Sequence, residues 1–131
     1  MTVLNIEEIA GAWFEMEGGG RVQLRSMTAI AMKAIHRQTV EKKAEYKRVE
    51  GKAERFEFET VNDDLQSELF WDYIIVGWEN LFDSKNTPIS CTKENKLLLM
   101  SRSAKFANFV SESLKKINDD EAKEAETTLK N

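Results

Sequence analysis

The sequence predicts a predominantly helical α+β protein, in which an N-terminal β-hairpin is followed by a bundle of about four helices. Two short segments of alternating apolar and polar residues flank three consecutive glycines at 18–20, a pattern typical of a hairpin. Four later segments place apolar residues at steps of three and four, and proline occurs only once, at Pro88. The first observation predicts the hairpin, and the second predicts the helices.

The length predicts a single globular domain. A chain of 131 residues is long enough to bury about two-thirds of its unfolded surface in one domain. We expect that domain to span residues 1–118. Residues 119–131 alternate in charge and have little to bury, so they are expected to form a frayed or disordered C-terminal tail.

Composition argues against several function classes. The net charge of −4 disfavours a general affinity for nucleic acid, which depends on a basic surface. One cysteine and one histidine are too few for a disulfide or a structural zinc site, and nothing in the sequence predicts a cofactor. The chain lacks a continuous apolar stretch of the roughly 18 residues that a membrane span needs, and it has no signal-peptide pattern. We therefore expect a cytoplasmic protein with no metal, no cofactor and no membrane contact.

The predicted N-terminal hairpin consists of residues 13–17 and 21–25. Phe14 and Met16 alternate with charged residues on one arm, and Val22 and Leu24 alternate with polar or charged residues on the other. A glycine triplet can also cradle a phosphate, but no Lys-Ser/Thr follows it and the next element has the period of a strand. The glycines are therefore interpreted as a turn. Residues 4–10 are expected to form a short helix or an extended arm.

A helix is expected from about residue 29 into the region of Glu45, capped by Ser26 or Thr28. Residues 46–60 allow two structures, a second hairpin across Gly51 or a loop. Basic residues are frequent between Lys33 and Lys52. They are interpreted as a solvated face of mixed charge, and the alternative is a nucleic-acid-binding patch.

The next predicted helix begins after an N-cap at residues 62–64 and continues to residues 81–82. Its middle, residues 70–78, is apolar on nearly every side, which is typical of a helix in the middle of a core. Trp78, Leu81 and Phe82 come at its end, where they either pack in the core or present an aromatic anchor to a protein partner.

Two further helices are expected after Thr92 and Ser103, each of which is a good N-cap residue. They should pack as a pair through apolar residues that include Phe106 and Phe109. These two phenylalanines complete the set of candidate partner-binding residues. Cys91 precedes the first of the two helices and is expected to be a small buried apolar residue.

No set of residues predicts catalysis. The acid pair Asp63–Asp64 falls at a helix start and the pair Asp119–Asp120 falls in the tail, and neither comes with a base, a nucleophile or a phosphate loop. We therefore expect a protein that is not an enzyme.

One stretch resembles a known family. The segments IIVGWENLFD, TPI and CTKENKLLLM resemble the tail assembly chaperones of long-tailed bacteriophages and prophages, and so does GGGRVQLRSMT near the N-terminus. The resemblance covers residues 18–35 and 70–117. The positions that match the pattern are Trp78, Asp83, Pro88, Ile89, Thr92, Glu94 and Asn95.

The resemblance implies a small non-enzymatic protein of a bacterial host that carries a phage or prophage. Such a protein binds the hydrophobic tape-measure protein, helps to recruit tail-tube subunits, self-associates and is absent from the mature virion. Two alternatives remain open. One is a virion structural protein, such as a tail or head-completion subunit, although a tube protein should be dominated by strands. The other is a small DNA-binding regulator that uses the basic stretch at 33–52.

Overall fold

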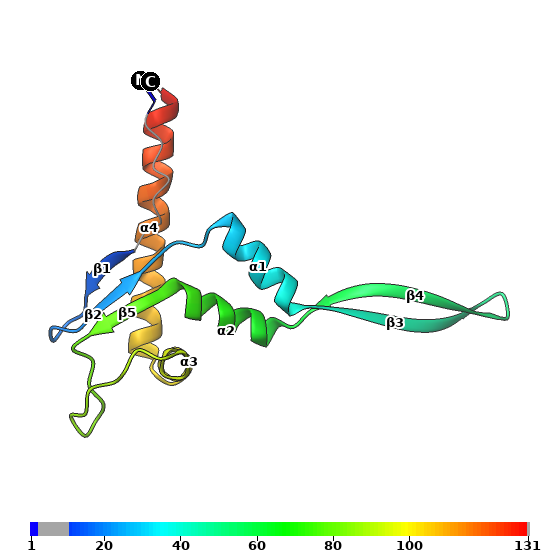
Figure 1. Cartoon of the computed structure of the whole chain (residues 1–131), viewed down its shortest axis with the longest axis horizontal. Helices are drawn as coiled ribbons and strands as arrows, with labels where there is room; N and C mark the ends of the chain where they lie inside the picture. The colour runs from blue at the N-terminus through cyan, green and yellow to red at the C-terminus, as the bar shows by residue number, and fades with distance from the viewer. Residues whose placement is uncertain (3–10, 131) are drawn as a thin grey trace. The chain divides into compact units, whose positions relative to one another are not determined.

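The structure is a computed structural model that describes residues 1–2 and 11–130, with side chains described as far as residue 122. The residues expected to form an N-terminal arm, 4–10, lie outside this part. The elements in chain order are β1 (Ala12–Glu15), β2 (Arg21–Leu24), α1 (Ala29–Thr39), β3 (Val40–Val49), β4 (Lys52–Val61), α2 (Asp63–Ile74), β5 (Ile75–Glu79), α3 (Lys93–Arg102) and α4 (Ala104–Lys130) (Figure 1).

The predicted fold class is wrong. The described residues form four helices and two antiparallel sheets, so the structure is mixed and not a predominantly helical bundle. The expected N-terminal hairpin is present. The error comes from two segments, residues 40–61 and 75–79, that form strands where the sequence was interpreted as helix or left open.

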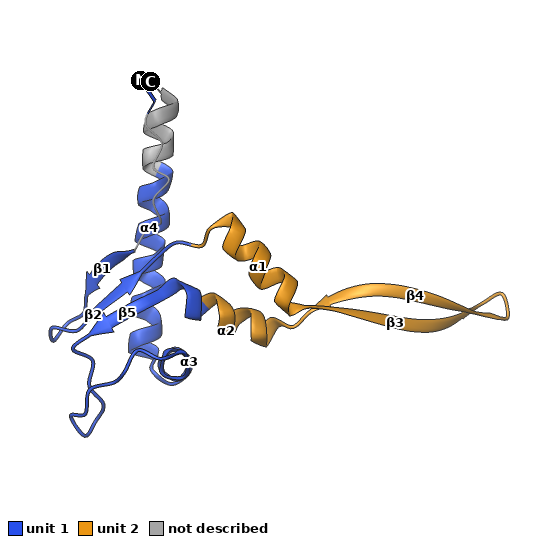
Figure 2. Ribbon diagram, in the orientation of Figure 1, with its two compact units in different colours: residues 1–26, 71–131 blue, residues 27–70 orange. Residues whose placement is uncertain are grey.

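The described chain divides into two compact units (Figure 2). Unit 1 comprises residues 1–26 and 71–131, and unit 2 comprises residues 27–70, so the division falls within α2. A single domain over residues 1–118 and a frayed tail over residues 119–131 stay predictions. α4 is continuous to Lys130 through the segment that was expected to be the tail.

Unit 1 is built on a three-stranded sheet of order β1-β2-β5 that packs against α4. The β1–β2 hairpin matches the prediction: Phe14 pairs with Val22, and Gly18 and Gly19 supply the positive φ angles of the turn. The core of this unit lies between the sheet and the helix. Its most deeply buried apolar side chains are Val22, Leu24, Ile74, Ile75, Phe106 and Val110.

The predicted helix to residues 81–82 ends early, at Ile74. The chain continues as β5, which pairs antiparallel with β2 and brings Trp78 opposite Val22. Ile75 and Val76 are β-branched and Gly77 is a poor helix former, so this short run favours a strand. A buried strand and a buried helix are both apolar on every side, so the apolar run at residues 70–78 could not show that the helix ends at Ile74.

Unit 2 contains α1, the β3–β4 hairpin and the first part of α2. Thr28 caps α1 by accepting a hydrogen bond from the backbone N–H of Ala31 (3.1 Å), as the sequence predicts. The helix ends at Thr39, earlier than predicted, because the chain enters β3 at Val40. Of the two structures considered for residues 46–60, the hairpin is the one present, and it extends from Val40 to Val61.

Helices α2, α3 and α4 all begin at capping side chains that the sequence predicts. The side-chain oxygens of Asn62, Thr92 and Ser103 accept hydrogen bonds from backbone N–H groups three residues ahead, at 3.2, 3.1 and 3.2 Å. α3 packs against α4 as expected. α3 is also tied to α2, because buried Lys96 donates to the backbone oxygen of Asp72 (3.1 Å) and to its carboxylate (3.2 Å).

Candidate partner-binding groove

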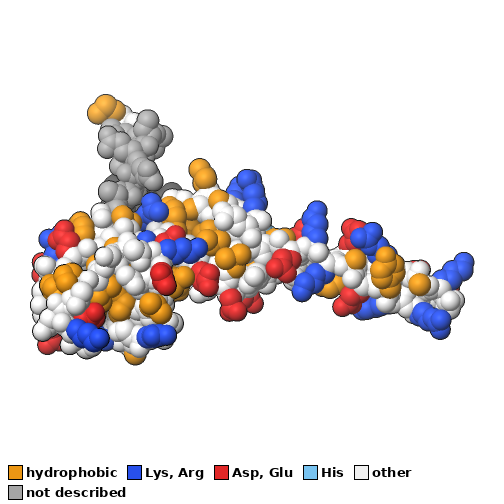
Figure 3. All heavy atoms as spheres, turned by 60° about the horizontal axis from the view of Figure 1, so that its bottom comes forward, with side chains coloured by type: hydrophobic (Ala, Val, Ile, Leu, Met, Phe, Trp, Pro, Cys, Tyr) orange, Lys and Arg blue, Asp and Glu red, His pale blue; other side chains and the backbone are white. Residues whose placement is uncertain are grey.

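A surface hollow of about 300 Å³ lies entirely within unit 1, and we call it the groove. The segments that line it are the β1–β2 turn, the loop after β5, the end of α3 and the start of α4. Hydrophobic side chains are exposed on the face of unit 1 shown in Figure 3. The apolar residues that line the groove are Met16, Leu81, Phe82, Ile89, Leu99 and Phe106, and its polar lining includes Glu17, Asn80, Ser103 and Lys105.

The loop after β5 is held in a defined shape. The Asp83 carboxylate accepts hydrogen bonds from the backbone N–H groups of Lys85 (2.9 Å) and Thr87 (3.0 Å). The backbone N–H of Ile89 donates to the backbone oxygen of Leu81 (2.8 Å). These bonds fold the loop back on itself and leave the Phe82 side chain 55% exposed at the groove.

Trp78 connects the loop to the core. Its indole N–H donates to the backbone oxygen of Ile89 (2.6 Å), and its ring meets Phe106 edge to face, with centroids 5.8 Å apart. Only 9% of Trp78 is exposed. Trp78 therefore packs beneath the groove lining, in contact with Phe106, and its hydrogen bond keeps Ile89 at the groove.

Gly20 allows the β1–β2 turn to approach the loop. A Cβ atom at this position would lie 2.7 Å from the Leu81 Cδ2 atom and 3.3 Å from the backbone oxygen of Asn80. A larger residue would therefore push Leu81 away from the groove, so the third glycine serves close packing and not the turn itself.

Three of the five candidate partner-binding residues, Leu81, Phe82 and Phe106, meet at the groove. Trp78 lies in the core in contact with Phe106, and Phe109 is half-buried on α4 and is not part of the groove lining. A partner-binding role for these five residues stays a prediction. Met16 and Leu99 also line the groove and were not predicted, because only the tertiary fold brings the β1–β2 turn and α3 to this loop.

Cys91 is exposed, whereas the sequence analysis expected a buried residue. Partial burial of the thiol raises its pKa, and the nearby Asp72 carboxylate acts in the same direction. The Lys96 ammonium group and a hydrogen bond from the Trp78 backbone lower the pKa and oppose these effects. The balance favours the neutral thiol at pH 7 over the reactive thiolate.

Two kinds of site are absent from the described residues. No group of three or more His, Cys, Asp or Glu side chains is placed to hold a metal ion in this part of the chain. Within the same residues, none of the helices is long and apolar enough to span a membrane.

The fold and the groove define a small mixed α and β protein with an apolar recess on its surface. The family model of the YdaY prophage proteins matches residues 24–131, which is 108 of the 131 residues. The chain therefore belongs to the YdaY prophage protein family, and the predicted phage or prophage origin is confirmed. Comparisons with curated proteins and with solved structures gave no match.

Proposed function

We propose that this prophage protein is a non-enzymatic tail assembly chaperone that binds the tape-measure protein, self-associates and helps to recruit tail-tube subunits. The observation that supports the proposal is the groove, where Phe82 is 55% exposed beside Leu81 and Phe106. Exposed aromatic side chains at the edge of an apolar recess are typical of protein-binding sites. The resemblance of residues 70–117 to tail assembly chaperones supports the tape-measure protein as the client.

The size of the groove sets how it binds. A volume of about 300 Å³ is at the lower end for a ligand pocket, so the groove accepts one or two apolar side chains and not a whole helix. A long client with apolar helical segments would offer such side chains on one face of each segment. A single contact is then weak, and several copies acting along one client provide the overall affinity by avidity.

The polar lining of the groove suits this task. Glu17 and Lys105 bring opposite charges to the edge of the groove, so hydrated groups surround its apolar centre. Two grooves with mixed charge repel each other less than two grooves of uniform charge would. The chain as a whole carries a net charge of −4, which favours solubility of a complex with an apolar client.

The proposal is tested by co-expression with the tape-measure protein encoded in the same prophage. We expect the wild-type chain to raise the soluble fraction of that protein. Phe82→Asp should abolish the gain, because an apolar side chain of the client would have to bury the carboxylate on binding. Ile30→Asp is the matched control, since Ile30 is an apolar residue that is 83% exposed on α1, outside the groove.

The result that overturns the proposal is a tape-measure protein that is equally insoluble with and without the wild-type chain. Equal effects of Phe82→Asp and Ile30→Asp would instead remove the groove as the binding surface.

The alternative of a virion structural protein is supported by one observation. The described residues form five strands in two antiparallel sheets, which is more strand than the predicted helical bundle contains. Mass spectrometry of purified phage particles separates the two functions. A structural subunit is retained in the particle at a fixed stoichiometry, whereas an assembly chaperone is present during assembly and absent from the finished particle.

A further inference from the structure

The β3–β4 hairpin of unit 2 is a two-stranded sheet with both outer edges open in the described part of the chain. Its strands are ten residues each, from Val40 to Val49 and from Lys52 to Val61, and they pair with each other alone. Residues 41–59 are all exposed. An isolated two-stranded hairpin is marginally stable in water, and its open edges offer unpaired N–H and C=O groups to another strand.

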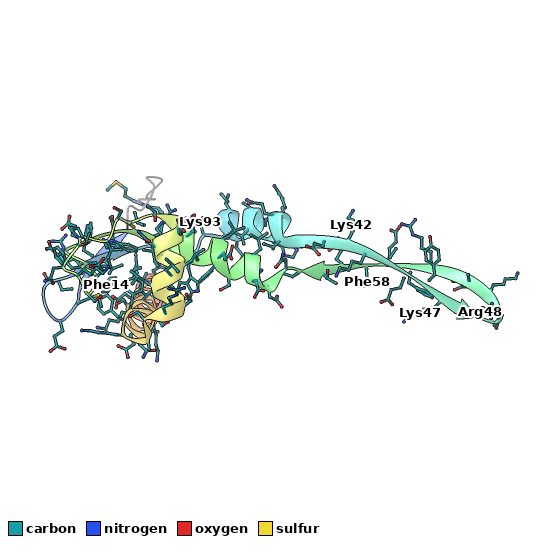
Figure 4. The ribbon with its side chains drawn as sticks, turned by 90° about the horizontal axis from the view of Figure 1, so that it is seen from below. Phe14, Lys42, Lys47, Arg48, Phe58 and Lys93 are labelled. Atoms are coloured by element: carbon teal, nitrogen blue, oxygen red, sulfur yellow. The ribbon has the colours of Figure 1, made fainter. Side chains whose placement is uncertain are left out.

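Both faces of the hairpin expose aromatic side chains. Phe56 and Phe58 are 42% and 38% exposed on one face, and Tyr46 is exposed on the other. Figure 4 shows Lys42 and Phe58 on opposite sides of the ribbon, as the register requires. Because both faces are apolar in part, neighbouring strands added at an edge would cover aromatic surface on both sides at once.

The two strands carry opposite net charge. β3 has four basic and two acidic side chains, for a net charge of +2, and β4 has two basic and three acidic side chains, for a net charge of −1. Two β3 edges therefore repel each other, while a β3 edge attracts a β4 edge. The charges are Lys42, Lys43, Lys47, Arg48, Glu41 and Glu45 on β3, and Lys52, Arg55, Glu54, Glu57 and Glu59 on β4.

We propose that this hairpin joins copies of the chain head to tail, with the outer edge of β3 in one copy paired antiparallel to the outer edge of β4 in the next. The inference rests on the self-association included in the proposed function and names its surface. Within one chain, the hairpin register places Lys42 opposite Glu59 and Lys47 opposite Glu54. The same register between copies repeats these favourable pairs.

The repeated register is compatible with the hydrogen bonding of an antiparallel sheet. Along each strand, successive residues direct their N–H and C=O groups alternately toward one neighbour and the other. A pair of residues that does not exchange hydrogen bonds within the hairpin can therefore do so across the outer edges. The contact uses different surfaces on the two copies, so it does not close on itself after one step.

The first test is a charge-reversal mixing experiment on the full chain, read by sedimentation velocity. The wild type should form oligomers that grow with concentration. Lys42→Glu/Lys47→Glu and Glu54→Lys/Glu59→Lys should each weaken association by about tenfold or more, because like charges then meet across the edges. An equal mixture of the two variants should restore association, since β3 of the first variant is complementary to β4 of the second.

The mixing experiment separates pairing between copies from folding of the hairpin. In each double variant the like charges also meet inside the chain, and mixing cannot relieve that. The fourfold variant with all these charges exchanged keeps complementary pairs within and between chains, so it should associate as the wild type does. A wild type that stays monomeric at all concentrations overturns the inference. So does a mixture that associates no better than its components while circular dichroism shows that both double variants keep the strand content of the wild type.

The second test holds even where a double variant fails to form the hairpin. On a Cys91→Ser background, Lys42→Cys and Glu59→Cys are made as separate chains and oxidised. A mixture of the two should give disulfide-linked dimers, because directly opposite residues of an antiparallel pair lie within disulfide range. Neither chain alone should cross-link. Dimers from Lys42→Cys alone, or none from the mixture, contradict head-to-tail pairing.

Failure of this inference is distinct from failure of the proposed function. A chain that is monomeric in both tests but still keeps the tape-measure protein soluble overturns the hairpin contact and leaves the chaperone function in place.

Discussion

At the scale of single residues, Trp78 performs two structural tasks. Its indole N–H binds the backbone oxygen of Ile89, and its ring packs edge to face on Phe106. The loop that carries Leu81, Phe82 and Ile89 begins directly after β5, the strand that contains Trp78. The hydrogen bond from Trp78 to Ile89 therefore fixes the position of this loop. A residue that the sequence presented as a binding candidate thus organises the residues that form the groove.

Trp78→Phe should lower the free energy of unfolding by about 2 kcal/mol, because it leaves the Ile89 carbonyl without its donor and removes part of the buried ring. Chemical denaturation monitored by circular dichroism measures the loss. Trp13→Phe is the matched control: Trp13 is exposed on β1, where it stacks with the Arg21 guanidinium 4.5 Å from its ring centroid, and its loss should be below about 1 kcal/mol. Equal losses in the two variants would show that the indole hydrogen bond contributes nothing.

At the scale of elements, the β3–β4 hairpin depends on its two-residue turn. Glu50 and Gly51 have φ angles of 54° and 80°, as a tight turn with two left-handed residues requires. Glycine adopts this conformation freely, whereas glutamate does not. The turn is therefore less stable than its sequence could make it.

Glu50→Asn should stabilise the hairpin by about 0.5 kcal/mol, since asparagine tolerates the left-handed conformation better than glutamate. The expected result is about a twofold rise in hydrogen-exchange protection of the β3 and β4 amides. Gly51→Ala is the opposite control. No atom lies within 4 Å of the added Cβ, so the expected loss of about 1 kcal/mol reports backbone strain alone. Increased protection in Gly51→Ala would contradict this account of the turn.

The elements that the sequence predicts correctly are those fixed by local chemistry. The caps at Thr28, Thr92 and Ser103 and the hairpin around the glycine triplet need only neighbouring residues to form. β5 was not predicted because every residue of the run IIVGW is apolar or small, so its pattern fits a helix as well as a strand. Its pairing with β2 also depends on residues more than fifty positions away. The first half of β3 was predicted as helix because no glycine or proline separates it from α1 and charged residues continue across the boundary.

The candidate site shows the same limit. Phe82 and Phe106 stand out as large apolar residues at an element end and on a helical stripe. Their convergence on one groove with Met16 depends on the packing of β5 against β2 and of α4 against the sheet, which the sequence pattern does not specify.

At the scale of the whole molecule, unit 2 is a continuous insertion between the two parts of unit 1 along the chain. The hairpin begins and ends at neighbouring positions, since the Asn62 backbone N–H donates to the Thr39 oxygen (2.8 Å). All three tryptophans, Trp13, Trp71 and Trp78, belong to unit 1, so intrinsic fluorescence reports on that unit.

Replacing residues 42–59 by Asn-Gly should leave unit 1 folded, because the Glu41–Thr60 pair remains to flank the new turn. The expected result is an unchanged tryptophan emission maximum and a thermal midpoint within about 4 °C of the wild type. A red-shifted emission would contradict the independence of unit 1 from the hairpin. The same variant should be monomeric, while its groove remains intact.

The alternation of faces along the hairpin also restricts how its length can vary within the family. Adding or removing one residue on each strand turns every side chain beyond that point to the opposite face. Phe56 and Phe58 would then lie on the face that now carries Tyr46, and Tyr46 would lie on the other face. Insertions and deletions that preserve both faces come two residues at a time on each strand, and each such step changes the reach of the hairpin by about 7 Å.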